Sequence, residues 1–134
     1  MKYSEFCRKQ EQAVSNLPMF FAFSNQQLQE NLKKYNYDMK DIVKIGYGGL
    51  CHKKDVNLIK DTFEKLTKEK EEYLKDENGL YSAFLYELGN HEYCITYDDQ
   101  EVFSALDIDI KTADKKTVNI YIKARAEYLK NAEW

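Results

Sequence analysis

Proline and glycine are scarce in this sequence, which has one proline, Pro18, and five glycines in 134 residues. We find no repeat, low-complexity segment or linker, so we expect a single globular domain over residues 1–134. No apolar run approaches the roughly 20 residues of a membrane span, and the polar start of the chain does not resemble a signal peptide. These absences predict a cytoplasmic protein that contacts no membrane.

Cysteine and histidine are also scarce, with three and two residues. An odd number of cysteines in a reducing compartment argues against a disulfide framework and leaves free or metal-bound thiols. The His-Glu-x-x-His motif lacks its second histidine after His91. The Pro-Cys-x-x-Cys motif of zinc deaminases is also missing, since Pro18 is the only proline. The motifs therefore do not require an enzyme.

The few soft ligands occur in two pairs, one directly after a glycine-rich turn and one at the predicted end of a helix. Zinc accepts both thiolate and imidazole ligands in a tetrahedron, so the two pairs predict a structural zinc site. The four predicted ligands are Cys51, His52, His91 and Cys94. Adjacent strand residues point to opposite faces, so Glu87 or Cys7 is a candidate replacement within the first pair. In the alternative interpretation, His91 caps its helix and the cysteines fill space.

Acidic residues are concentrated in the middle third of the chain. Residues 76–114 carry ten acidic side chains and one basic side chain, giving −9, while the segments on either side each carry +3. Such a field repels nucleic acid and attracts a basic protein groove, although a solvated acidic stretch is the alternative. The predicted partner-binding residues are Asp98, Asp99, Glu101, Asp107 and Asp109. The 11 tyrosines suit either a protein-binding surface or an aromatic core.

Hydrophobic periodicity predicts an α+β fold. Short apolar runs near residues 19–23, 42–46 and 50–54 predict a small, mostly antiparallel sheet of three strands. Helical spacing, with capping-box patterns that begin at Ser24 and at Asp98, predicts about five or six helices packed with this sheet. These helices are expected over residues 3–16, from 24 to the loop at 36–40, and over 54–75, 80–91, 99–106 and 112–132. Residues 76–79 are expected to interrupt the helical pattern.

Four segments resemble a small family of phage and prophage proteins of unassigned biochemistry. They are residues 20–24 (FFAFS), 45–49 (IGYGG), 86–96 (YELGNHEYCIT) and the final Glu133-Trp134. The composition and size also resemble the type II-A anti-CRISPR proteins of streptococcal prophages. This resemblance implies a non-enzymatic inhibitor in the cytoplasm of a bacterial host. It would bind an RNA-guided CRISPR nuclease and block its use of target DNA, without binding nucleic acid itself.

The same resemblance favours the structural zinc, although Cys51-His52 stands where relatives would be expected to carry an aliphatic-basic pair. Two other functions remain open. One is a small metal-dependent enzyme acting on nucleotides or signalling molecules, which would need an open coordination site beside a free Glu87 or Glu92. The other is a phage housekeeping or virion-accessory module that uses a tyrosine-rich surface.

Overall fold

The computed structural model describes residues 1–46 and 49–132. These residues fall into two compact units, which we call the helical unit, Met1–Lys9 with Glu69–Trp134, and the sheet unit, Gln10–Lys68. Tyr47 and Gly48 of the 45–49 motif lie outside the described residues, as does the final Glu133-Trp134. The single domain expected over residues 1–134 stays a prediction.

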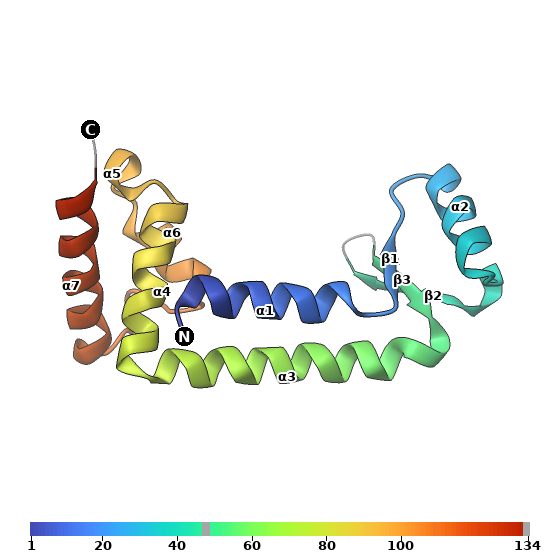
Figure 1. Ribbon diagram of the computed structural model, residues 1–134, viewed down its shortest axis with the longest axis horizontal. Coiled ribbons are helices and arrows are strands. Elements are labelled where there is room, and N and C mark those ends of the chain that lie inside the picture. Colours follow the sequence, from blue (N-terminus) through green and yellow to red (C-terminus); the bar gives the residue numbers. More distant parts are fainter. Residues whose placement is uncertain (47–48, 133–134) are drawn as a thin grey trace. The chain divides into compact units, whose positions relative to one another are not determined.

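Seven α-helices and three antiparallel strands are present in the described ranges, so the predicted α+β class is confirmed (Figure 1). The strands are β1 (Met19–Phe21), β2 (Ile42–Gly46) and β3 (Gly49–His52). The helices are α1 (Tyr3–Ser15), α2 (Asn25–Tyr35), α3 (Val56–Lys75), α4 (Glu77–Asn90), α5 (Tyr93–Thr96), α6 (Asp99–Ala105) and α7 (Lys115–Asn131). Two short 3-10 helices are η1 (Met39–Asp41) and η2 (Lys53–Asp55). No helix in the described ranges has the length and apolar character that crossing a membrane requires.

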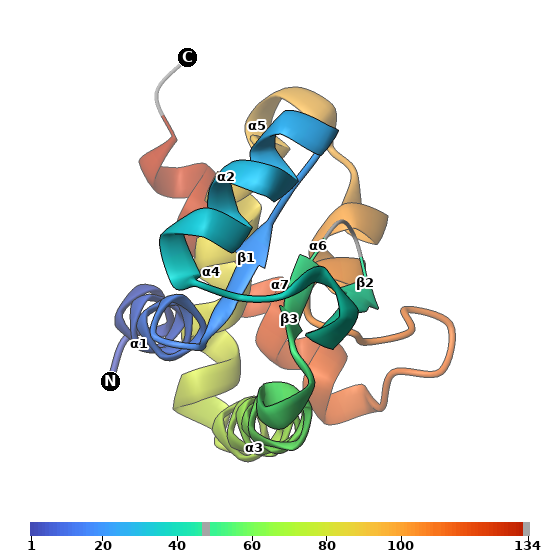
Figure 2. The ribbon, with the colours of Figure 1, turned by 90° about the vertical axis from the view of Figure 1, so that its right-hand side faces the viewer.

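The sheet has the strand order β1-β3-β2, so both β1 and β2 are edge strands. Phe20 lies opposite Leu50, and Lys44 lies opposite Leu50 from the other side. Because side chains alternate along a strand, these three residues share one face of the sheet. Helix α2 covers this face, where the rings of Phe20 and Tyr35 stack with centroids 5.5 Å apart (Figure 2).

The opposite face of the sheet carries Met19 and Cys51, which lie opposite each other in the β1-β3 pair. Val14 of α1 and Ile59 of α3 line a hollow on this face together with Met19. Of these residues Cys51 is fully buried and Ile59 is nearly so. The sheet is therefore placed between α2 on one side and the sheet-unit parts of α1 and α3 on the other.

The predicted capping box at Ser24 is confirmed with one change of partner. The Ser24 hydroxyl accepts a hydrogen bond from the Gln27 amide at 3.2 Å, as expected for an N-cap. The Gln27 side chain accepts from the amide of Phe23 at 2.8 Å instead of from Ser24. Helix α2 ends at Asn36, which takes the left-handed conformation with φ 57° and closes the last turn.

The helical unit has one apolar core, formed mainly by α4, α6 and α7. Helix α4 packs lengthwise on α7 (Figure 1), and the core also includes Tyr3 from the start of α1. The completely buried side chains of this core are Ala83, Phe84, Leu88, Val102 and Ala124. Phe84, Phe103 and Tyr121 form a triangle of ring contacts with centroids between 4.7 and 5.2 Å apart.

The break expected at residues 76–79 is much narrower in the structure. Helix α4 begins at Glu77, and only Asp76 stands outside helix, as its N-cap. The short helix α5 was not expected from the sequence. It begins after Glu92 and ends before Tyr97, and both of these residues adopt positive φ, at 50° and 52°. Non-glycine residues rarely take this conformation, so the sequence does not predict where α5 begins and ends.

Candidate functional site

Three carboxylates of the acidic segment begin helices. Asp76 accepts a hydrogen bond from the Gly79 amide at 2.9 Å, Asp98 from Gln100 at 3.0 Å, and Asp114 from Thr117 at 2.7 Å. Hydrogen bonds with Thr117 hold the pKa of Asp114 below its ordinary value. N-capping is a structural role, and each capping carboxylate also places its charge where the helix dipole favours it. Part of the acidic excess is therefore explained by local structure.

Two of the predicted partner-binding residues face inward, toward other residues of the helical unit. Asp99 accepts a hydrogen bond from the Tyr121 hydroxyl and lies 3.8 Å from the Arg125 guanidinium. Burial, followed by the hydrogen bond to Asp99, raises the pKa of Tyr121. Glu101 lies 3.5 Å from Nδ1 of His91, although 53% of its side chain remains exposed. Asp99 is therefore tied to α7 with 35% of its side chain exposed, while Glu101 remains within reach of a partner.

The other three predicted partner-binding residues keep carboxylate oxygens near the surface. Asp98 caps α6, and Asp109 accepts a hydrogen bond from the Lys111 amide at 2.9 Å in a turn. Asp107 is 88% exposed, and its carboxylate lies 3.8 Å from the ammonium of Lys70. An exposed ion pair of this length contributes little to stability, so the Asp107 charge is available for an outside contact.

His91 lies between two carboxylates at the C-terminal end of α4. Its Nε2 lies 3.1 Å from the buried Glu87 carboxylate, and its Nδ1 faces Glu101. The Glu87 carboxylate also accepts a hydrogen bond from the side-chain amide of Asn90, at 3.4 Å. A protonated imidazole can donate to both carboxylates, so the ring is suited to join α4 to α6. The backbone amide of His91 also bonds to the Glu87 carbonyl at 3.0 Å, which is the helix-capping role considered from the sequence.

Cys94 has its own partner within the helical unit. Its backbone amide donates to the Tyr128 hydroxyl at 3.3 Å. A hydrogen bond with the Cys94 side chain is also the main cause of the raised pKa of Tyr128. The thiol thus faces α7, and no hydrogen bond or ion pair in the described residues joins it to His91.

Cys51 and His52 belong to the sheet unit and lie on opposite faces of β3. Cys51 is fully buried, and this burial raises the pKa of its thiol and disfavours the thiolate that a metal binds. Nδ1 of His52 accepts from the Lys54 amide at 3.1 Å, and its ring meets the Tyr37 ring edge-on at 5.0 Å. The alternation along the strand therefore separates the two side chains, as anticipated from the sequence.

The predicted zinc ligands are thus divided between the two units. Cys51 and His52 lie in the sheet unit, and His91 and Cys94 lie in the helical unit. Within residues 1–46 and 49–132, no three or more His, Cys, Asp or Glu side chains are grouped so that they could hold a metal ion. The structural zinc stays a prediction from the sequence.

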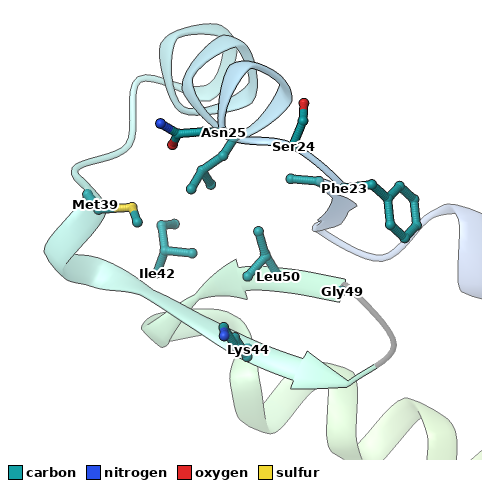
Figure 3. Close-up of a pocket in the computed structure, with 10 residues that line it drawn as sticks. Phe23, Ser24, Asn25, Met39, Ile42, Lys44, Gly49 and Leu50 are labelled. Atoms are coloured by element: carbon teal, nitrogen blue, oxygen red, sulfur yellow. The ribbon is translucent and has the colours of Figure 1, made fainter.

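The sheet unit contains a pocket that the sequence did not point to (Figure 3). Its volume is about 590 Å³, and it opens between the start of α2 and the face of the sheet that α2 covers. Its lining residues are Ala22, Phe23, Ser24, Asn25, Leu28, Met39, Ile42, Lys44, Gly49 and Leu50. One signal was present in the sequence, because Lys44 places a charge within the apolar run 42–45.

Comparison with known proteins gives one match. No curated protein and no solved structure matches the chain, and the resemblance to anti-CRISPR proteins stays a prediction. A family model described as "Family of unknown function (DUF7659)" matches residues 2–127. Because this match spans nearly the whole sequence, the chain belongs to the DUF7659 family.

Proposed function

We propose that this protein is a non-enzymatic inhibitor that acts by binding a basic protein surface through the acidic side of its helical unit. The most specific partner that the sequence resemblance implies is a type II-A CRISPR nuclease of the bacterial host. Such a nuclease holds its guide-target duplex in a positively charged channel. An acidic protein of this size in that channel would compete with target DNA.

The observation that supports this proposal is the exposure of carboxylates around α6 and the turn after it. Glu101 and Asp107 remain at least half exposed, at 53% and 88%, and Asp109 is also exposed. The helical unit as a whole carries 16 acidic and 11 basic side chains, giving a net charge of −5. This imbalance favours encounter with a basic surface and makes the encounter sensitive to salt.

Asp99 is excluded from this surface because its carboxylate is held by Tyr121 and Arg125. Reversing its charge would disturb the helical unit as well as any partner contact. A test of the acidic surface therefore uses amide replacements elsewhere, which remove charge and keep hydrogen-bonding oxygens. Asparagine is as good an N-cap as aspartate, so Asp98→Asn should leave α6 intact.

The test is displacement of labelled target DNA from a guide-loaded type II-A nuclease by the purified full-length chain. The test variant combines Asp98→Asn, Glu101→Gln, Asp107→Asn and Asp109→Asn. We expect its inhibition constant to rise on the order of tenfold, because each exposed charge contributes a fraction of a kcal/mol. Inhibition by the parent chain should also weaken as salt is raised.

The matched control removes four exposed acidic charges from the sheet unit, through Glu11→Gln, Glu30→Gln, Asp61→Asn and Glu64→Gln. It changes the net charge equally and should leave inhibition nearly unchanged. If both variants lose inhibition equally, the effect depends only on the net charge of the protein, and the proposed surface would be overturned. Failure of the parent chain to displace DNA from any type II-A nuclease would overturn the proposed partner.

The predicted zinc is tested separately by elemental analysis of the purified protein, with His91→Ala and Cys94→Ala variants alongside. Zinc in the parent protein that is lost from both variants would support the predicted ligands. Zinc retained by both variants would contradict them. For the alternative function of a metal-dependent enzyme, no observation in the described residues gives specific support.

A further inference from the structure

The pocket under α2 has the size and most of the character of a small-molecule site. Its volume of about 590 Å³ lies within the range of roughly 300–1,000 Å³ that is usual for ligand pockets. Ile42 and Leu50 point into it from the sheet (Figure 3), and Leu28 of α2 also belongs to its apolar lining. Phe23 and Met39 stand at its rim with 77% and 54% of their surface exposed. A ligand on this lining could therefore also cover Met39, a large apolar side chain that the protein leaves in water.

Lys44 is the one charged residue among the described residues that line this pocket. It lies on β2 directly opposite Leu50, two residues after Ile42, and so interrupts an otherwise apolar row on the α2 side of the sheet. Lys44 is exposed, and it makes no ion pair or side-chain hydrogen bond with any residue in the described ranges. The pocket therefore combines an apolar body with one positive charge that has no counter-charge.

The charge around the pocket favours an anionic ligand. Among the described residues, no acidic side chain is part of the lining, and the sheet unit carries 9 basic and 7 acidic side chains, giving a net charge of +2. A cationic ligand would meet the Lys44 ammonium with nothing to offset the repulsion. A neutral apolar ligand would leave that ammonium partly desolvated and unpaired, which is unfavourable.

We propose that this pocket binds a small organic anion that has an apolar body and a single carboxylate or phosphate group. The apolar body lies on Leu28, Ile42 and Leu50, and the acidic group pairs with Lys44. This site belongs to the sheet unit and does not depend on the acidic surface of the helical unit. The two proposals can therefore fail independently of each other.

A simpler role for Lys44 is protection of an edge strand. β2 lies at the edge of the sheet, and a lysine there discourages pairing with strands of other molecules. That role requires no ligand and predicts no preference for anions. The two roles are distinguished by whether an amphiphilic anion binds in this pocket.

The experiment is a titration of the full-length chain with decanoate and with decyl phosphate, followed by isothermal calorimetry and by NMR of side-chain methyl groups. Decyltrimethylammonium is the control probe, because it has a similar apolar chain and a positive head group. All three probes are used below their micelle concentrations. We expect at least one anion to bind and to shift the methyl signals of Leu28, Ile42 and Leu50. The ammonium probe should bind much more weakly, and a preference for carboxylate or phosphate would identify the acidic group.

Lys44→Gln should weaken anion binding about three- to fivefold, which is the effect of a partly exposed ion pair. Lys60→Gln is the matched control, because Lys60 is an exposed lysine of the hollow on the opposite face of the sheet. It should leave the affinity unchanged. Both variants should keep the far-ultraviolet circular dichroism of the parent chain, since both residues are exposed.

Three results would overturn the proposal. The first is the absence of methyl shifts at these residues with either anion. The second is equal affinity for the anionic and cationic probes, which would remove the role of Lys44. The third is a set of shifts centred on Ile59 and Val56, which would place the ligand in the opposite hollow.

Discussion

Each unit of this protein contains an aromatic cluster, and the two clusters differ in burial. In the helical unit, Phe84, Phe103 and Tyr121 are almost completely buried and meet ring to ring. In the sheet unit, Phe21 and Phe23 stack with centroids 6.4 Å apart while remaining largely exposed. Exposed large apolar side chains in a cluster are more informative than buried ones, because stability alone does not require them. The aromatic cluster of the helical unit therefore serves packing, while the Phe21-Phe23 cluster of the sheet unit leaves apolar surface open to contact.

The units also differ in charge, at −5 for the helical unit and +2 for the sheet unit. The acidic unit is the one with the closed core, and the weakly basic unit is the one with the open apolar pocket. Each unit therefore offers a different chemistry to a partner. An acidic protein surface and an anion pocket are independent features, and variants in one unit should not affect the other.

The largest predicted effect is in the centre of the helical core. Phe84→Ala should lower the free energy of unfolding by about 3–5 kcal/mol, because a completely buried ring is removed and its neighbours cannot fill the space. Urea titration followed by circular dichroism measures this loss. A loss below about 1.5 kcal/mol would mean that the core collapses around the cavity, and that the helical unit is less tightly packed than the comparison states.

The second effect is alkaline destabilisation that originates in the helical unit. The pKa of Tyr121 is raised in the folded state by burial and by Asp99, so the folded protein keeps a proton that the unfolded chain releases near pH 10. Stability should be fully retained below about pH 10 and should fall above it, by at most about 1.4 kcal/mol per pH unit for this group. Urea midpoints measured between pH 9 and pH 11.5, values chosen to bracket the ordinary tyrosine pKa of about 10, test this.

The slope of that decline should become shallower in Tyr121→Phe. Tyr35→Phe in the sheet unit is the control, because Tyr35 is an exposed residue and its hydroxyl can be removed without opening a core. An identical alkaline slope in the parent chain and in Tyr121→Phe would assign the decline to other groups. That result would also contradict the expectation that the alkaline loss of stability originates in the helical unit.

The third prediction concerns two glycines of α4 that differ in their surroundings. A Cβ at Gly79 would clash with the Tyr73 carbonyl oxygen, so Gly79→Ala should destabilise the protein by about 1–3 kcal/mol. A Cβ at Gly89 would meet nothing within 4 Å. Because Gly89 is exposed, Gly89→Ala should stabilise α4 by about 0.5–1 kcal/mol. Thermal melts of the two variants should shift in opposite directions, and shifts of the same sign would contradict the close approach at Gly79.

The smallest effect is expected on the sheet unit. Phe23→Ala removes a ring that is mostly in water, so stability should change by less than about 0.5 kcal/mol. The same urea titration as for Phe84→Ala gives a direct contrast between the units. A loss above 1 kcal/mol, about twice the expected limit for a surface substitution, would show that Phe23 supports the fold rather than the rim of the pocket.

Local patterns were enough to predict most of the fold. Pro18 and the Ser24 capping box mark the end of α1 and the start of α2, because these signals act within a few residues. The capping box at Asp98 predicts two reciprocal hydrogen bonds, and only one of them is present. Asp98 does cap α6, but Glu101 turns to His91 instead of back to the cap.

The candidate site was harder to predict because its contacts join distant parts of the chain. Asp99 reads as one more acid in an acidic segment, yet its partner Tyr121 lies 22 residues away on α7. The strand order, and with it the position of Lys44 on the face under α2, also depends on long-range pairing. No local spacing rule describes such contacts, so the inward-facing carboxylate and the pocket emerged only from the structure.

The buried position of Tyr3 has a consequence for synthesis of the protein. Its backbone amide bonds to the Ser82 hydroxyl at 3.0 Å, and the Tyr73 hydroxyl bonds to the Met1 carbonyl at 2.7 Å. The first nine residues thus belong to a unit whose remainder begins only at Glu69. On the ribosome, the whole sheet unit emerges before the partners of Tyr3 exist, so the Tyr3 ring stays uncovered until the end of α3 and α4 have been made.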